Sequence, residues 1–416
     1  MTASVLAVDF GTSNSAAAML DGGRPRRIPI EAGADTLPTA VFFPSEGGAM
    51  RIGEAAGAAL IDGEPGRYMR ALKSILGTAL FGESRLIGGR RQTLADVVTA
   101  FLAELKRRAE VETGQRFTHA LSGRPVQFHS ERPDRNARAE ADLRACYRAA
   151  GFEDVRFLFE PEAAARTRRG MGSDLGLIVD IGGGTSDFTV FRAGNTGLDV
   201  LASHGIRLGG TDFDREVSMT HAMPLLGHGG QLRRQFGEGL HAVPTAIYRE
   251  LATWANIPFL YSRETEREVA DLKRYAVEPD KIARLAEVIE HRLGHELAFA
   301  VERGKIDANT GAPDAAIPMA FVEPGLSAPI TSGTLDAALQ GFRTRLSEAM
   351  HETLTRADTP AERIGAVILV GGSSLMGLVT DTVAGICPGA DVQQSEAFTA
   401  VVDGLALATA EAAFQD

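Results

Sequence analysis

The chain has 416 residues, a length that corresponds to two or three domains. Hydrophobic residues make up 44% of it and charged residues 23%, values typical of a soluble globular protein that can bury a sizeable core. The formal net charge of −11 argues against non-specific binding to nucleic acid or to an anionic membrane surface.

The first predicted element is a hairpin. The apolar run 5–8 predicts a strand that ends in a turn of Gly, Thr, Ser and Asn, and the run 16–20 predicts the returning strand. Asp9 interrupts the first apolar run, so no secretory signal is expected there, and no window approaches the length of a transmembrane helix. Cys146 and Cys387 lie next to apolar or small residues and are expected to be buried thiols of a cytoplasmic protein.

Beyond the hairpin, strands and helices alternate along the chain. Short apolar runs predict strands at 117–121, 155–159, 177–180 and 366–370. Apolar residues at helical spacing predict helices at 93–112, 135–150, from 161, across 245–303 with breaks near two prolines, at 373–384 and at 397–413. This alternation is typical of the α/β class.

One short sequence pattern occurs twice. The segment VLAVDFGTSNSAAAML near the start is similar to LIVDIGGGTSDFTVF in the middle. Each has an apolar strand with Asp at its end (Asp9 or Asp180), a turn of Gly, Thr and Ser, and a second apolar strand. The repeat predicts two similar domains that face each other, each contributing one hairpin to a shared cleft.

The two turns have the composition of a phosphate-binding site. Glycine lets the backbone N–H groups approach phosphate oxygens closely, while hydroxyl and amide side chains add donors. Asp9 and Asp180 are expected to hold Mg²⁺ through water, because Mg²⁺ keeps several of its waters. Two ordinary hairpin turns would be the alternative, but both turns recur with the same order of residues. Neither a P-loop nor a Rossmann fingerprint is present.

At these residues the sequence resembles the nucleotide-binding half of the seventy-kilodalton heat-shock chaperones. AVDFGTSNS and VDIGGGTSDF resemble the two phosphate loops of that family, ALKSILG its catalytic-lysine segment, and FEPEAAA the segment that joins its lobes. IRLGGTDFDREV, VERGKI and ILVGGSSLMGLV resemble, in the family's order, the segment after the second loop, the adenosine-contacting helix and the adenosine loop.

The resemblance implies an actin-like ATPase fold: two similar, ribonuclease-H-like lobes around a central nucleotide cleft, with an α-rich subdomain inserted in the second lobe. It implies a first lobe at 1–165, a second lobe at 166–390 with the α-rich insert at about 220–310, and a C-terminal helical segment at 391–416 that packs back on the first lobe.

The resemblance also implies roles for individual residues, with ATP or ADP and Mg²⁺ as ligands. Lys73, Glu160, Asp180 and Thr185 would be catalytic: Lys73 reaches the γ-phosphate, Glu160 helps to place the attacking water, and Thr185 hydrogen-bonds the γ-phosphate. Asp9 and Asp180 would surround the metal through water. The remaining nucleotide contacts would come from Gly11, Thr12, Ser13, Asn14, Gly182, Gly183, Gly184, Gly209, Gly210, Glu302, Lys305, Gly371, Gly372 and Ser373.

The sequence departs from the family's pattern at the base. The family places adenine between two arginines, and those positions fall on Ile306 and Leu375 here. A cation stacked on an aromatic face contributes about 0.5–2 kcal/mol, so weaker or less base-selective binding is expected. The sequence ends about where the family's interdomain linker begins, and its length and the segments LYS and IEHRLGHELAFAVE resemble the short YegD-like branch.

The expected function is that of an ATPase whose lobes close on ATP and reopen after hydrolysis. The conformational change would be read by a protein client or co-chaperone, with no nucleic acid and no membrane as partner. A sugar-type small-molecule kinase of the same fold and an actin-like filament protein are the alternatives, because fold alone does not fix function. His291 and His295 do not have the H-E-x-x-H order of a metalloprotease and are expected to be ordinary helix histidines.

Overall fold

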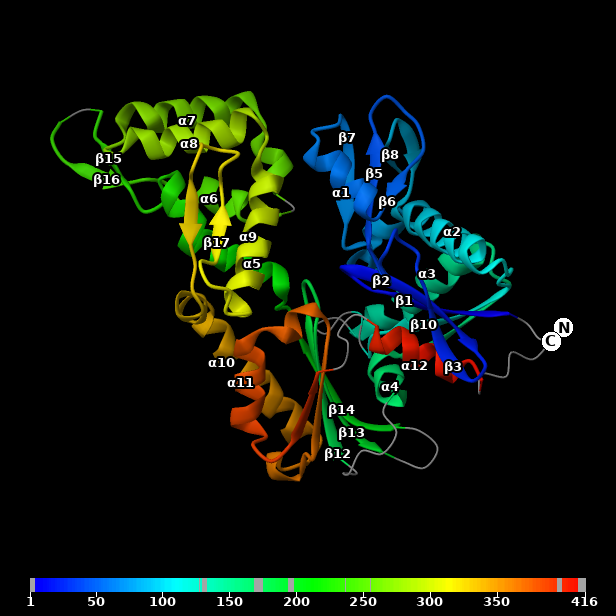
Figure 1. Ribbon diagram of the computed structural model, residues 1–416. Helices are drawn as coiled ribbons and strands as arrows, with labels where there is room; N and C mark the ends of the chain where they lie inside the picture. Colours follow the sequence, from blue (N-terminus) through cyan, green and yellow to red (C-terminus); the bar gives the residue numbers. More distant parts are fainter. Residues whose placement is uncertain are drawn as a thin grey trace. The chain divides into compact units, whose positions relative to one another are not determined.

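A computed structural model describes residues 4–126, 128, 133–167, 175–193, 198–235, 237–254, 256–394 and 399–410. These residues form two compact units. The first unit comprises Met1–Arg207, Leu346–Leu375 and Val379–Asp416, and the second comprises Leu208–Arg345 and Met376–Leu378 (Figure 1). The predicted lobe boundaries remain predictions.

The first unit contains a six-stranded mixed sheet near the N-terminus. Its main path runs β11-β10-β1-β2-β3, and β4 pairs with β2. The strands β1 (Val5–Phe10), β2 (Asn14–Asp21) and β3 (Arg24–Ile28) form an antiparallel meander, whereas β10 (His119–Arg124) and β11 (Asp154–Phe159) run parallel to β1. The short β4 spans Thr36–Pro38.

A second sheet in the same unit repeats this topology. Its order is β14-β13-β12-β19-β20, with β12 (Leu175–Ile181), β13 (Ser186–Ala193) and β14 (Leu198–Ile206) as the meander. The strands β19 (Ala366–Val370) and β20 (Asp391–Gln394) add in parallel on the β12 side. The predicted internal repeat is therefore a repeated sheet, and β12 starts the second copy as β1 starts the first.

Helices cover these sheets and close the core. The helix α2 (Leu94–Thr113) begins at Thr93, whose side chain accepts a hydrogen bond from the Asp96 amide and whose amide donates to the Asp96 carboxylate. α3 (Asn136–Ala149) packs on α2 and is followed by Gly151 at a φ of +91°. The apolar faces of α2 and α3 form one core with the first sheet.

A second core joins the two sheets. It contains Ala7 and Leu121 from the first sheet, Ile178 and Ile368 from the second, and the small residues of two helices. Those helices are α4 (Glu160–Arg166) and α12 (Ala400–Ala408), which lie side by side in Figure 1.

A small three-stranded sheet, β6-β5-β7, belongs to the first unit as well. It consists of β5 (Ala40–Pro44), β6 (Arg51–Ile52) and β7 (Gly66–Arg70), and α1 (Glu54–Ile61) packs on it around buried Phe42. The hairpin of β8 (Arg85–Ile87) and β9 (Arg90–Gln92) precedes α2.

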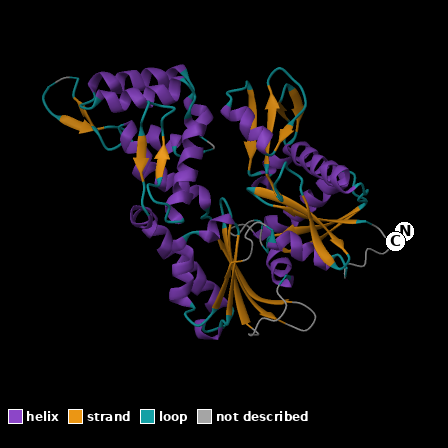
Figure 2. Cartoon of the chain, in the orientation of Figure 1, coloured by secondary structure: helices purple, strands orange, loops and turns teal. Residues whose placement is uncertain are grey.

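The second unit is mainly helical (Figure 2). Its helices are α5 (Gly210–Val217), α6 (Ala246–Leu251), α7 (Arg263–Tyr275), α8 (Pro279–Glu290) and α9 (Gly294–Asn309), with two hairpins, β15 (Gln231–Arg233) with β16 (Leu240–Ala242) and β17 (Ala316–Pro318) with β18 (Ser327–Pro329). Residues of α10 (Ser332–Arg356) and α11 (Gly377–Ile386) fall in both units.

Most of the predicted elements are present, with some differences at their ends. Pro279 is the first residue of α8, where its missing N–H costs nothing, and Pro258 lies in a short 3₁₀ turn. The helix predicted at 373–384 begins as a 3₁₀ turn, Gly372–Leu375, and becomes α-helical only at Gly377. The last predicted helix is α12, and its outer predicted residues, 397–398 and 411–413, lie outside the described part of the chain.

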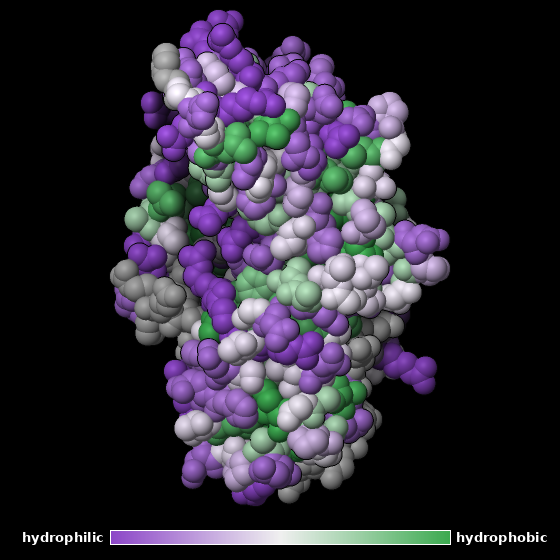
Figure 3. Space-filling model, turned by 90° about the vertical axis from the view of Figure 1, so that its left-hand side faces the viewer, coloured by the Kyte–Doolittle hydropathy of each residue, from purple (hydrophilic) through white to green (hydrophobic). Residues whose placement is uncertain are grey.

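The remaining expectations concern single side chains and the surface. Both cysteines are buried, as predicted. His295 is buried in α9, whereas His291 lies at the end of α8 within 3.5 Å of Glu287. Hydrophilic side chains cover most of the face in Figure 3, and apolar ones gather only in small patches. Within the described residues, no helix has the length and apolar character needed to cross a bilayer.

Candidate functional site

The two predicted phosphate turns occupy equivalent places in the two repeated sheets. Gly11, Thr12 and Ser13 connect β1 to β2, and Asn14 is the first residue of β2. Residues 182–185 connect β12 to β13 in the same way, and the Gly182 amide donates a hydrogen bond of 3.0 Å to the Thr185 carbonyl oxygen. Each turn is thus a tight connection in an antiparallel hairpin.

The structure brings these turns together. A Cβ atom on Gly183 would lie 2.5 Å from Ser13 Oγ, and one on Gly11 would lie 2.1 Å from the Asn14 carbonyl oxygen. A Cβ on Gly184 would meet nothing within 4 Å. Glycine at 11 and 183 therefore permits approaches that a side chain would block, and the backbone beside Gly184 is left open toward a ligand.

Lys73 and Glu160 form a buried ion pair beside the turns. Lys73 lies in the 3₁₀ turn Leu72–Ile75, which follows Ala71 in a left-handed conformation with φ of +57°. Glu160 is the first residue of α4, and the Lys73 ammonium donates to its Oε1. Only 9% and 11% of the two side chains are exposed, so this pair is held away from bulk water.

Three aspartates share the electrostatic environment of that pair. Burial, followed by repulsion from Glu160, raises the pKa of Asp9 to about 7, and attraction to Lys73 opposes the rise. Burial together with repulsion from Glu160 and then Asp187 raises the pKa of Asp180 to about 8. Burial lowers the pKa of Lys73, but attraction to the surrounding carboxylates outweighs it and the net shift is upward. One lysine thus faces four carboxyl groups.

Asp187 is the member of this group that the sequence analysis missed. It is the antiparallel partner of Asp180 in the β12–β13 register, and burial and repulsion from Glu160 raise its pKa to about 7. At the equivalent position of the first hairpin, Ala16 is the partner of Asp9. Aligning the two repeats residue by residue would have shown this extra carboxylate in the second one.

Gly371 begins the predicted adenosine loop, and it lies beside Asp180 at the end of the second sheet. It follows β19, the parallel neighbour of β12, and has a φ of +80°. A Cβ on Gly371 would lie 2.5 Å from the Ile181 carbonyl oxygen and 2.8 Å from Asp180 Oδ1. Gly372 and Ser373 start the 3₁₀ turn that follows.

Residues 5–224 match the model of the family described as Hsp70 protein. That range covers more than half of the chain and includes both turns, Lys73 and Glu160. The chain belongs to the Hsp70 family. The predicted fold class, the α/β actin-like ATPase fold, is confirmed, and the family makes this an Hsp70-like, ATP-binding protein.

The other predicted nucleotide contacts lie in the second unit of this Hsp70-like chain. Gly209 and Gly210 begin α5, and the Gly209 amide donates to the Asp212 carboxylate at 3.1 Å. Glu302 and Lys305 are in α9, outside the range of the family match. Lys305 is buried and its ammonium lies 2.6 Å from Asp214 Oδ1, a partner that the sequence did not predict.

Both residues at the family's arginine positions are surface-exposed aliphatics. Ile306 in α9 is 49% exposed and Leu375 is 36% exposed. Apolar side chains of this size are usually buried, so each leaves an apolar surface open.

The first unit fits a magnesium–nucleotide complex of the kind that Hsp70 proteins generally bind. The glycine turns leave room for phosphate oxygens. Four carboxyl groups surround the single charge of Lys73, so a bound cation would reduce their mutual repulsion. No group of three or more His, Cys, Asp or Glu among the described residues is arranged to ligate a metal directly. The donor set therefore suits Mg²⁺ held through its waters, for which Asp9, Asp180 and Asp187 are the candidates.

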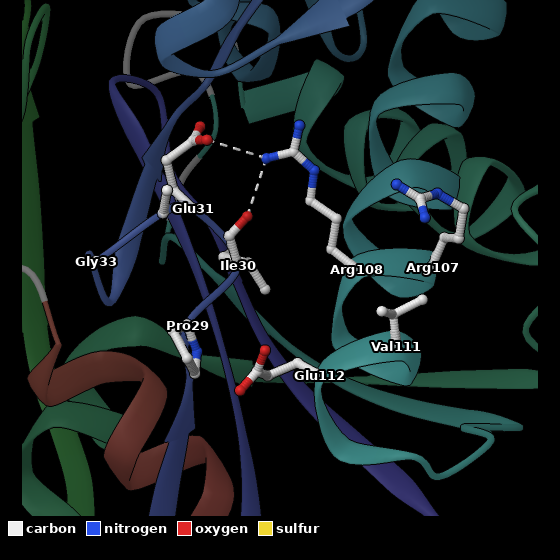
Figure 4. Close-up of a pocket in the computed structure, with 9 residues that line it drawn as sticks. Pro29, Ile30, Glu31, Gly33, Arg107, Arg108, Val111 and Glu112 are labelled. Carbon is white, nitrogen blue, oxygen red and sulfur yellow. Dashed lines mark hydrogen bonds and ion pairs between the residues drawn. The ribbon is translucent and has the colours of Figure 1, made fainter.

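A separate hollow in the first unit contains none of these residues. It lies between 29–33 and the second half of α2, where Arg108 contacts the Ile30 carbonyl oxygen at 2.9 Å and Glu31 at 3.3 Å (Figure 4). Arg107 pairs with Glu104 at 2.6 Å. Because both arginines already have acidic partners, the hollow adds no ligand site.

Proposed function

We propose that this Hsp70-family chain binds ATP with Mg²⁺ and hydrolyses it slowly to ADP and phosphate. The lobes that carry the two turns close on ATP and reopen after hydrolysis, and a protein client or co-chaperone reads that change. One observation carries the proposal. The turns at Ser13 and Gly183 meet beside the buried pair of Lys73 and Glu160.

Each residue of the site has a task in this proposal. Gly11, Thr12, Ser13 and Asn14 wrap the phosphates from one side, and the second turn wraps them from the other. Lys73 presents its charge to the γ-phosphate, where negative charge develops in the transition state. When bound, Mg²⁺ neutralises the phosphate oxygens and is held through water by Asp9 and Asp180.

Glu160 and Thr185 complete the chemistry. Glu160 accepts a hydrogen bond from the attacking water and so orients it, while its ion pair with Lys73 fixes the carboxylate. Thr185 is exposed in the second turn and offers its hydroxyl to the γ-phosphate. The reaction needs no covalent intermediate, because positioning and electrostatics supply the catalysis.

The adenosine side of the site is proposed from the family resemblance. Gly371, Gly372 and Ser373 form the floor of the adenosine pocket, Glu302 and Lys305 contact the ribose, and Gly209 and Gly210 take part in nucleotide binding. The YegD-like branch is proposed on the same resemblance. A cytoplasmic location is proposed from the two buried thiols, Cys146 and Cys387.

A turnover assay with purified protein, ATP and Mg²⁺ tests the proposal. Phosphate should be released without any second substrate. Its release should stop when EDTA is added, and its rate should not depend on a panel of added sugars. Phosphate transfer that requires a sugar would instead establish the kinase alternative. Limited proteolysis of the protein with ATP, with ADP and without nucleotide tests lobe closure. If the lobes close on ATP, the protease should cleave the ATP-bound protein more slowly than the other two forms.

A further inference from the structure

The C-terminal helix α12 crosses α4 with backbone against backbone. A Cβ atom on Gly404, in the middle of α12, would lie 1.7 Å from the Ala163 carbonyl oxygen and 2.4 Å from its carbonyl carbon. No side chain fits there, although glycine inside a helix costs about 1 kcal/mol relative to alanine. Gly404 thus sets how closely the two helices approach, and Figure 1 shows them side by side.

This crossing lies one helical turn from Glu160. α4 starts at Glu160 and reaches Ala163 three residues later, so a shift of the helix at Ala163 moves the Glu160 backbone as well. A Cβ on Gly123 of β10 would lie 3.2 Å from Glu160 Cγ and 3.4 Å from both Leu405 Cδ1 and Val401 Cγ1. Side chains of α12 and the stem of Glu160 therefore meet at the same point of the first sheet.

An ion pair fixes α12 along its own axis. Arg27 of β3 donates to both carboxylate oxygens of Asp403, at 3.0 Å from Nε and 2.7 Å from Nη2. Asp403 precedes Gly404, and its side chain is only 15% exposed. A bidentate contact of this kind fixes direction as well as distance, so it holds α12 on β3 at the residue next to Gly404.

We propose that Gly404 is a positioning residue for Glu160. The close crossing of α12 on α4 sets where the Glu160 carboxylate lies against Lys73, and through it the rate of ATP hydrolysis. The inference rests on the proposed function for its kinetic consequence. A displacement of a catalytic group by about 1 Å is enough to lower a rate about 10²-fold.

Gly404→Ala tests this inference, with Gly385→Ala in α11 as the matched control. A Cβ on Gly385 would meet nothing within 4 Å, so the control makes the same chemical change in a helix without a close neighbour. The expected result for Gly404→Ala is a single-turnover rate about 10²-fold lower, with ATP affinity within about threefold of the parent. Gly385→Ala should have the single-turnover rate and the ATP affinity of the parent.

A second variant covers the case in which Gly404→Ala fails to fold. Gly123→Ala adds one methyl group 3.2 Å from Glu160 Cγ, a distance that the side chain accommodates by a small shift. It should lower the single-turnover rate by about tenfold and leave ATP affinity unchanged. Parent-like rates in the folded variants would overturn the inference.

A spectroscopic readout separates this inference from the proposed function. The ¹³C-carboxyl resonance of Glu160, assigned with Glu160→Gln, should move in Gly404→Ala or Gly123→Ala and stay in place in Gly385→Ala. If the parent protein hydrolyses no ATP, the proposed function fails. The position of the Glu160 resonance in the variants then decides by itself whether Gly404 positions Glu160. An unmoved resonance in folded Gly404→Ala refutes that role whatever the kinetics show, even if the resonance moves in Gly123→Ala, whose methyl group contacts Glu160 directly.

Discussion

Asp180→Asn should stabilise the nucleotide-free protein at high pH while abolishing its magnesium-dependent ATP binding. In the folded protein, burial and repulsion from Glu160 and Asp187 raise the pKa of Asp180 to about 8, against an ordinary value of 3.8. As pH rises between these values the unfolded chain releases a proton that the folded chain keeps, so stability is lost across that window. Asparagine has the shape of the protonated carboxyl and removes the part of this pH dependence that Asp180 contributes.

The size of the effect follows from the shift. One pKa unit corresponds to about 1.4 kcal/mol, so the full shift sets an upper bound of about 5–6 kcal/mol. Asp180 is half-buried and is repelled by Asp187, whose own protonation weakens that repulsion, so solvent and the neighbouring carboxyl reduce the gain. We expect Asp180→Asn to be more stable than the parent by about 1–3 kcal/mol above pH 8, and equal to it near pH 4.

Urea unfolding between pH 4 and 9, with EDTA and without nucleotide, measures the gain, and calorimetric titration measures ATP binding. Asp271→Asn on the exposed side of α7 is the control and should change neither quantity. A variant Asp180→Asn that matched this control at every pH would refute the account of carboxylate repulsion. Unchanged magnesium-dependent ATP affinity would refute the assignment of Asp180 to the metal.

Three further variants test other parts of the site. Lys73→Ala should bind ATP yet turn it over about 10²–10³-fold more slowly in steady-state assays, because its charge acts mainly on the transition state. Gly371→Ala should cost about 1–3 kcal/mol in urea unfolding and weaken ATP binding, since its φ is +80° and the new Cβ would lie 2.5 Å from the Ile181 carbonyl oxygen. Ile306→Arg with Leu375→Arg should tighten ATP a few-fold to about tenfold by calorimetry, and the parent should discriminate weakly between ATP and GTP.

Each of these three predictions has a result that would contradict it. An unaltered turnover number in Lys73→Ala would make Lys73 a structural partner of Glu160 only. Gly371→Ala should be compared with Gly389→Ala, where a Cβ meets nothing within 4 Å, and equal stability of the two would contradict the strain argument. If the double arginine variant bound ATP no better than a parent that already prefers ATP over GTP, the adenine pocket lies elsewhere.

The sequence predicted the two Gly-rich hairpin turns because their information is local, whereas their binding of phosphate stays a prediction. Apolar runs on both sides, an Asp at the strand end and a Gly-rich turn lie within about fifteen residues of one another in each hairpin. The same local reasoning predicted β19 at residues 366–370 and α2 close to its observed ends. Local propensity and turn chemistry suffice where one element and its turn define the structure.

Other parts depend on pairing between distant segments and were missed. Asp187 looks like any polar residue in an exposed strand until the register places it opposite Asp180. The sheet of β5, β6 and β7 was not predicted, and neither was α10, a helix of 25 residues. The pair of Lys305 with Asp214 joins α9 to α5 across 91 positions, and no local pattern marks such a contact.

Two kinds of glycine explain why the proposed catalytic residues are easier to find in the sequence than the residues that support them. Gly11 is needed for a contact with Asn14 inside its own turn, so its neighbours in sequence reveal its purpose. Gly404 is needed because of Ala163, which lies far away in the chain, and in sequence it looks only like a weak point in a helix. The proposed catalytic residue Glu160 was found from its own segment. The rate it is proposed to support would also depend on α12, which no motif connects to it. Substitutions in the last helix should therefore alter catalysis without touching a single residue of the recognised motifs.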